Sequence, residues 1–303
     1  MNVIQLSRKK FETLEPLVLS REIMSTEAEV YEFRHKGAPK VLKRLFHQEG
    51  ERFANKLYTV EMLDANRRYL PDHFCIPEAL VTVGGNIEGF ILPKLEGSAL
   101  VSVLNDKSLD NQEHIYYLKK VGEILQQLKA IRSYTPLKDI YIGDMHESNF
   151  IVNPDNRQVT VIDLDSCKIG NNQSMPGRYL TPLSLLTNVK GKYKTNKEPY
   201  LGYVTADEQS DLYCYTIMIL NYLLGEDADD FTLEEFYEYL NYLEFIGVDR
   251  ELIDVFGKIV TNKANENPMP YLDTLTDENI CRAKDRVYKK VKAVNRKNAL
   301  AQS

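Results

Sequence analysis

The segment 140–170 restricts the possible folds of this chain more than any other. Two apolar runs, residues 150–152 and 159–164, flank the polar connection 153–158. Because Asn, Pro and Asp favour a tight turn, the pattern predicts two short paired strands. Pairing would bring the residues just before the first run and those at the end of the second run to one end of a hairpin.

Polar residues stand at both of these positions. Asp144 and Asn149 lie five residues apart before the first run, and Asp163 and Asp165 lie at the end of the second. Each could serve only as a turn cap, since Asp and Asn are common in loops. Taken together and in this order, they form a cluster of carboxylate and amide oxygens. Such a cluster suits Mg²⁺ and a phosphate-bearing substrate.

This segment resembles the catalytic and metal-binding loops of the protein-kinase-like phosphotransferases. That family carries the pattern H-R-D-x-x-x-x-N followed by D-F-G. Here residues 142–149 read IGDMHESN and residues 163–165 read DLD. The resemblance implies that Asp144 accepts the proton of the attacking hydroxyl. It also implies that Asn149 and Asp163 bind the Mg²⁺ ions that bridge the nucleotide phosphates.

Departures from the family pattern affect the functional interpretation. Ile142 and Gly143 replace the His-Arg pair, so we expect less control by a phosphate docked beside Asp144. The sequence Gly-Asp-x-His, which ends at His146, is closer to the aminoglycoside and choline phosphotransferases, which share this fold. His146 could contact substrate or only pack locally. Asp165 stands where D-F-G has glycine, and its role is open.

A lysine upstream completes the expected phosphate site. Residues 40–46 predict a strand, and alternation places Lys43 on one face with Val41 and Leu45. This position resembles the third-strand lysine of the family, which reaches the α- and β-phosphates. A solvated lysine on an edge strand is the alternative interpretation. Arg44 replaces Lys43 as the candidate if the strand register shifts by one residue.

Helical periodicity follows at residues 49–69, where apolar residues recur at three- and four-residue spacing. The corresponding helix of the family carries a glutamate that holds the strand lysine. Glu61 stands at about the right distance beyond Lys43 and is the candidate for that role, with Glu51 as the alternative. A glutamate that only faces solvent would fit the same pattern.

Residues 24–31 stand where the family has its glycine-rich loop over the phosphates. Only the closing Val-Tyr matches that loop, while Ser25 and Ala28 occupy glycine positions. Both are small, so the backbone could still approach a phosphate, although less freely than glycine allows. A plain hairpin would explain this segment equally well.

Residues 77–92 predict a hairpin with a Gly-Gly-Asn turn. Pro93, Lys94 and Leu95 follow it directly. By position they resemble the hinge of a two-lobed kinase, where backbone groups hydrogen-bond an adenine ring. We therefore place the domain boundary at about residue 95.

The remainder of the chain is mostly helical by pattern. Residues 111–132 carry an apolar stripe, and residues 211–225 form an almost wholly apolar helix, which belongs in the centre of a domain. Asp211 and Gly225 resemble the residues with which protein kinases brace the catalytic loop and end this helix. Asp211 could also be an N-cap. The long polar segment 166–206 resembles an activation segment and protein-docking platform, without a recognisable A-P-E at its close.

The order of these segments is more specific than any motif within it. The resemblance covers about residues 17–275 and implies an α+β, bilobal protein-kinase-like fold with a β-rich N-lobe and a mainly helical C-lobe. The implied divisions are a lead-in at 1–16, the N-lobe at 17–95, the C-lobe at 96–277 and a basic C-terminal helix or tail at 278–303.

Composition argues against several other classes of protein. The net charge of −6 and the pI near 5.6 argue against general nucleic-acid binding, apart from the basic C-terminal tail. No apolar run approaches the roughly 18 residues of a membrane helix, and the first residues lack the features of a signal peptide. The four cysteines form no C-x-x-C pair, so we expect no zinc site, no disulfide framework and a cytoplasmic location.

These patterns predict an ATP- and Mg²⁺-dependent kinase, with Ser or Thr of a protein substrate as the first choice of acceptor. A small-molecule kinase of the aminoglycoside or choline type is one alternative, favoured by Gly-Asp-x-His. A pseudokinase that binds nucleotide as a scaffold is the other, favoured by the missing loop glycines. The joint presence of Lys43, Asp144, Asn149 and Asp163 weighs against the scaffold.

Overall fold

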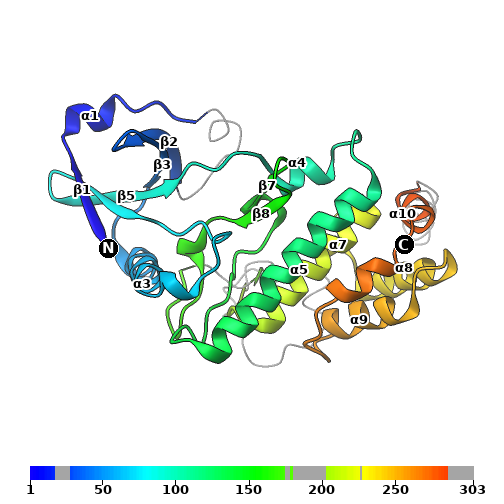
Figure 1. The fold of residues 1–303 in the computed structure, drawn as a ribbon. Coiled ribbons are helices and arrows are strands. Elements are labelled where there is room, and N and C mark those ends of the chain that lie inside the picture. The colour runs from blue at the N-terminus through cyan, green and yellow to red at the C-terminus, as the bar shows by residue number, and fades with distance from the viewer. Residues whose placement is uncertain (18–27, 175–177, 180–202, 226, 286–303) are drawn as a thin grey trace, which may run out of the picture.

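The computed structural model describes residues 1–17, 28–174, 178–179, 203–225 and 227–285. Its large sheet lies toward one end of the molecule and most of its helices toward the other (Figure 1). The α-helices are α1 (Arg8–Glu12), α3 (Gly50–Ala65), α4 (Leu100–Leu104), α5 (Asn111–Tyr134), α7 (Glu208–Leu224), α8 (Leu233–Phe245), α9 (Arg250–Val260) and α10 (Asp277–Lys284).

The large sheet has five strands in the order β1-β4-β5-β3-β2. These strands are β1 (Asn2–Leu6), β2 (Ala28–His35), β3 (Ala38–Leu45), β4 (Ala79–Val83) and β5 (Asn86–Pro93). β1 runs parallel to β4, and the other neighbours are antiparallel. Gly84 and Gly85 connect β4 to β5 with positive φ at both positions. Tight hairpin turns of the I′ kind require that backbone conformation, which glycine adopts without steric cost.

Residues 1–16, expected only as a lead-in, contribute the edge strand β1 and helix α1 to the structure. β1 pairs with β4 from Asn2 opposite Ala79 to Leu6 opposite Val83. So short a run carries little alternation of its own, and its partner lies far along the chain. The strand therefore depends on tertiary pairing that local sequence patterns do not specify.

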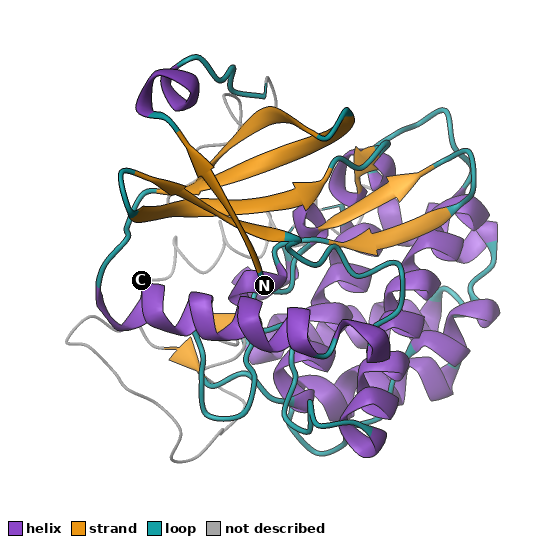
Figure 2. Cartoon of the chain, turned by 60° about the vertical axis from the view of Figure 1, so that its left-hand side comes forward, coloured by secondary structure: helices purple, strands orange, loops and turns teal. Residues whose placement is uncertain are grey.

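Each face of the large sheet has its own apolar cluster. Leu42 and Ile91 belong to the cluster on one face. Leu45 and Phe90 belong to the other cluster, where they pack with Val60 of α3. Figure 2 shows α3 as a long helix beside the sheet. Because strand residues alternate between faces, Leu45 and the residue two before it point to the same side as α3.

The smaller sheet, which carries the predicted central hairpin, has the strand order β6-β7-β8. Its strands are β6 (Ser98–Ala99), β7 (Phe150–Asn153) and β8 (Gln158–Val161), and a separate two-stranded pair joins β9 (Arg178–Tyr179) to β10 (Tyr203–Val204). The β7–β8 register runs from Phe150 opposite Val161 to Asn153 opposite Gln158. β8 ends three residues before the apolar run does, so the residues after Val161 are free to turn toward β3.

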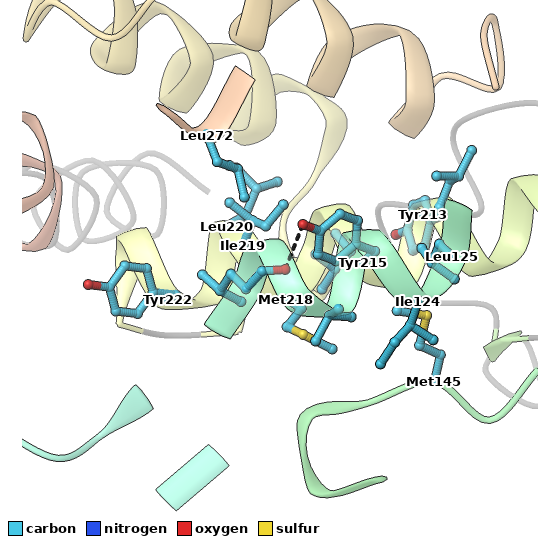
Figure 3. Close-up of a cluster of buried hydrophobic side chains, with 14 of the residues drawn as sticks. Ile124, Leu125, Met145, Tyr213, Tyr215, Met218, Ile219, Leu220, Tyr222 and Leu272 are labelled. Carbon is cyan, nitrogen blue, oxygen red and sulfur yellow. Dashed lines mark hydrogen bonds between the residues drawn. The ribbon is translucent and has the colours of Figure 1, made fainter. Parts of the chain in front are cut away.

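Helix α7 lies at the centre of the largest apolar cluster, and 13 of its 17 residues are buried. Figure 3 shows Tyr215 and Met218 of α7 among Leu125 of α5 and Leu272. The Tyr215 hydroxyl donates a hydrogen bond of 2.8 Å to the carbonyl of Leu118 on α5. Burial on all sides is what the uninterrupted apolar sequence of this helix predicts.

Several sequence-based predictions of local structure are confirmed. The hairpins expected at 77–92 and within 150–164 are present, as are the helices expected at 111–132 and 211–225. The mixed α/β class also agrees with the prediction, and the bilobal kinase-like architecture stays a prediction. Within the described residues, no helix combines the length and the apolar character needed to cross a membrane.

Gly122, inside α5, allows a close helix contact that a larger residue would prevent. A Cβ at this position would overlap the side chain of Met269 and lie 2.7 Å from the Tyr215 hydroxyl oxygen. We expect Gly122→Ala to lower the free energy of unfolding by about 1–3 kcal/mol through overpacking. In the matched variant Gly257→Ala on α9, the added Cβ would meet Leu240 at an ordinary 3.5 Å.

Gly257→Ala should be neutral or stabilising, because alanine exceeds glycine in helix propensity by up to about 1 kcal/mol. Urea titration of both variants beside the wild type measures the two effects. Equal effects of the two substitutions would contradict a specific requirement for glycine at Gly122.

Candidate functional site

The β7–β8 hairpin brings Asn149 and Asp163 to the same end, as its predicted strand pairing requires. The short 3-10 helix Glu147–Asn149 leads directly into β7. The amide of Ile162, just before Asp163, donates a hydrogen bond of 2.9 Å to the carbonyl of Asn149. Asp163 itself has a left-handed backbone conformation, with φ 62° and ψ 27°. That conformation is uncommon outside glycine and turns the chain sharply after the strand.

The loop before β7 holds Asp144 in a partly enclosed position. The Asn149 side-chain amide donates a hydrogen bond of 2.8 Å to the carbonyl of Asp144, which closes the loop on itself. Burial raises the pKa of Asp144, the cation of a protonated His146 would lower it, and the charge of Asp163 raises it further. The His146 Nε2 atom lies 3.9 Å from Asp144 Oδ1. A carboxylate whose pKa is raised is a stronger base than an ordinary one, so Asp144 is suited to accept a proton.

Asp211 connects this loop to the helical core. Its Oδ2 accepts a hydrogen bond of 3.0 Å from the amide of Ile142, and its Oδ1 accepts one of 3.0 Å from the amide of Gly143. Asp211 lies in the first turn of α7, and its residue is 2% exposed. Burial raises the pKa of Asp211 to about 6, and the two backbone donors counteract part of that rise. The N-cap of α7 is Asp207, so Asp211 is free to brace the loop.

Lys43 reaches the end of the hairpin from β3, about 120 residues away in the sequence. Its Nζ forms an ion pair with Asp163 and a second ion pair, of 2.7 Å, with Asp165 Oδ1. Burial alone would lower the pKa of Lys43, but the two carboxylates raise it above its ordinary value. Lys43 is therefore a buried cation held between two anions.

Arg44, the replacement candidate for a shifted register, points elsewhere. Its Nε lies 3.6 Å from Glu88 Oε2, and its guanidinium lies 5.0 Å from the ring centre of Phe11. The β3 register thus directs Lys43, and not its neighbour, toward Asp163.

Helix α3 meets this group of charges with a residue that the sequence reasoning missed. Lys56 Nζ lies 2.8 Å from Asp165 Oδ2 and 2.9 Å from Ser166 Oγ. Glu61, the residue expected to hold Lys43, is exposed, so the expectation for this glutamate does not agree with the structure. Glu61 is exposed because α3 is oriented with its apolar stripe toward the sheet, and Glu61 lies off that stripe. The sequence signal for Lys56 was its position within that apolar stripe, where a lysine needs a buried partner.

The structure describes two of the three remaining candidates, the alternative glutamate and Ala28. Glu51 is exposed in the first turn of α3. Ser25 lies outside the described residues. Ala28 opens β2, where it is buried opposite Leu45.

The proposed hinge residues lie at the end of β5 and just after it. Pro93 ends β5 opposite Lys40, and Leu95 is half-buried. The Lys94 side chain is 40% exposed and pairs with Glu32 at 2.5 Å. Their position at the end of β5 agrees with the expected order of elements, and their contact with an adenine ring stays a prediction.

Within the described part of the chain, no group of three or more His, Cys, Asp or Glu side chains is arranged to hold a metal ion. The four cysteines are free thiols. No protein-family model matches the chain, and a search of curated proteins finds no match either. The resemblance described above therefore depends on the residues and their geometry.

Asp211→Asn tests whether the pKa of Asp211 is raised in the folded protein. Because the pKa of Asp211 is raised from 3.8 to about 6 in the folded protein, the folded state binds this proton more tightly than the unfolded state. The stability that this group contributes is therefore complete below about pH 4 and is lost as the pH rises through about 6. The wild type should lose up to about 3 kcal/mol of unfolding free energy relative to Asp211→Asn over that range, since one pKa unit corresponds to about 1.4 kcal/mol.

Denaturant titrations of both proteins at intervals from about pH 4 to pH 7 would measure this difference. A stability difference that is independent of pH, or that grows in favour of the wild type as the pH rises, would contradict a raised pKa for Asp211.

Proposed function

We propose that this protein transfers the γ-phosphate of ATP to a hydroxyl group in a reaction that requires Mg²⁺. The observation that best supports this proposal is the ion pairing of Lys43 with Asp163 and Asp165 beside Asn149 and Asp144. These residues come from β3 and from the segments just before β7 and just after β8, which lie at the same end of the hairpin. Phosphoryl transfer needs little covalent chemistry from a protein, because positioning and charge stabilisation supply most of the catalysis.

Asp144 is the residue proposed to orient the acceptor hydroxyl and to accept its proton. Its raised pKa, caused chiefly by burial, brings the carboxylate closer to the range in which a general base works at neutral pH. Two supports fix its backbone. The Asn149 amide bonds the Asp144 carbonyl, and Asp211 accepts from the amides of the two preceding residues.

Asn149 and Asp163 fit the protein part of a Mg²⁺ site. Mg²⁺ in nucleotide enzymes commonly takes one or two side-chain oxygens from the protein and the rest from phosphates and water. The Asn149 side chain donates through its nitrogen to Asp144, which leaves its Oδ1 as the atom suited to a cation. The Asp163 side chain is 27% exposed and so can turn toward a ligand. Bound Mg²⁺ would neutralise charge on the phosphates, while Lys43 would hold them in place.

Ser or Thr in a protein substrate is the acceptor that we propose first. The support is Asp211, which braces the loop as described, together with Gly225 at the C-cap of α7, since this pair resembles the protein-kinase branch. A small hydroxyl-bearing acceptor is the second candidate. His146, which lies 3.9 Å from Asp144 and completes the Gly-Asp-x-His sequence, favours it.

Asp144→Asn and Asp163→Asn test the proposed roles, and Asp155→Asn is their matched control in the exposed turn of the same hairpin. With Mg²⁺ and γ-labelled ATP, alone and with a generic basic protein, the wild type should label protein. Asp144→Asn should reduce transfer by at least about 100-fold, the usual effect of removing a general base. Asp163→Asn should abolish Mg²⁺-dependent transfer with the far-UV circular dichroism spectrum unchanged, and Asp155→Asn should match the wild type.

Mg²⁺-dependent transfer that persists in Asp163→Asn would contradict the metal assignment. ATP consumption that depends on Asp144 and on a small hydroxyl acceptor, without label on protein, would favour the second candidate. Binding of Mg–ATP with no transfer to any acceptor would instead favour a nucleotide-binding scaffold.

A further inference from the structure

A second lysine is buried beside Lys43. Lys56, on α3, is 4% exposed, and its ammonium group contacts Asp165 and Ser166 at 2.8 and 2.9 Å. A buried charge is strongly unfavourable unless it is paired and hydrogen-bonded. The same helix face carries the fully buried apolar residues Val60 and Leu63, and one other buried polar residue, Thr59. An aliphatic residue would therefore suit the packing, and the charge of Lys56 must be explained by its partner.

That partner, Asp165, holds two lysines with its two oxygens. Oδ1 lies 2.7 Å from Lys43 Nζ, and Oδ2 lies 2.8 Å from Lys56 Nζ. The Asp165 side chain is 2% exposed, whereas that of Asp163 is 27% exposed. A ligand that arrives from solvent would meet Asp163, while Asp165 stays enclosed between the lysines.

We infer that Lys56 and Asp165 are positioning residues that keep Lys43 in place when nucleotide binds, an inference that rests on the proposed function. A cation that draws Asp163 away leaves Lys43 with Asp165 as its partner. Asp165 keeps its orientation because Lys56 fixes its second oxygen. Helix α3 thus supplies a lysine where the family resemblance predicts a glutamate, and the carboxylate comes from the segment after β8.

Two further hydrogen bonds join α3 to the same segment. The Asn55 side-chain amide donates to the carbonyl of Gln173 at 2.9 Å, and the Thr59 hydroxyl donates to the carbonyl of Cys167 at 3.2 Å. They flank Lys56 on the helix. The placement of Lys56 is therefore coupled to the docking of the whole helix, and through Asp165 to Lys43.

Lys56→Met tests this role, because methionine keeps most of the aliphatic length and removes the charge. We expect the KM for Mg–ATP to rise at least tenfold and the KM for the acceptor to stay unchanged. Lys40→Met is the matched control, since Lys40 lies on the same strand as Lys43, points to the other face, and forms an ion pair of 2.7 Å with Glu78. Its KM for Mg–ATP should stay within twofold of the wild type.

A purely structural role for Lys56 would reduce the fraction of active protein, and so would lower kcat without changing the KM for Mg–ATP. That result, or a KM in Lys56→Met equal to that of the wild type, would overturn the inference. An equal rise in the KM for Mg–ATP in the Lys40→Met control would also overturn it, because the effect would not be specific to the contact between Lys56 and Asp165.

A second measurement needs no nucleotide and separates this inference from the proposed function. Urea unfolding of the wild type, Lys56→Met, Asp165→Asn and the double variant forms a double-mutant cycle. Coupling should appear as a double variant that is less destabilised than the two single variants combined, since each single change leaves a buried charge with one partner fewer. Additive effects of the two substitutions on the free energy of unfolding would contradict a direct interaction between Lys56 and Asp165. If the cycle shows coupling but the wild-type protein binds no Mg–ATP, the proposed function is contradicted, and the interaction between Lys56 of α3 and Asp165 is retained.

Discussion

The carboxylate of Asp165 is the point at which three separate parts of the molecule are joined. It receives Lys43 from the large sheet and Lys56 from α3, and it belongs to the segment that leaves the β7–β8 hairpin. Apolar packing brings α3 to the sheet, but such packing has no strong directional preference. Buried ion pairs are directional, and removing one partner leaves an uncompensated charge. The charged contacts therefore determine how the helix, the strand and the hairpin are aligned.

A second constraint acts on the loop that carries Asp144. Asp211 accepts the amides of Ile142 and Gly143, and α7, which carries Asp211, is the most deeply buried helix of the large apolar cluster. Asp144 is thereby fixed to the helical core, whereas Lys43 is fixed to the sheet. The end of the β7–β8 hairpin lies between them, so the candidate site is built where the two parts of the fold meet.

Local patterns in the sequence predicted those parts of the site that depend on local structure. The apolar runs around 153–158 predicted the hairpin and hence the proximity of Asn149 to Asp163. They did not predict the partner of Asp165, because that contact depends on how α3 is rotated against residues more than 100 positions away. Helical periodicity identified a buried stripe, and Lys56 lies three residues after Phe53 and four before Val60 in it. A lysine in such a stripe signals a buried partner without identifying it.

The contacts made by Asp163 and Asp165 also bear on the order in which the chain folds. Their ion pairs with Lys43 and Lys56 join residues separated by 109 to 122 positions in the sequence. Closing so long a loop costs more chain entropy than forming the β7–β8 turn or one helix. Hairpins and helices should therefore form first, and the charged centre should assemble last. A refolding chain would then regain its secondary structure before it regains the candidate site.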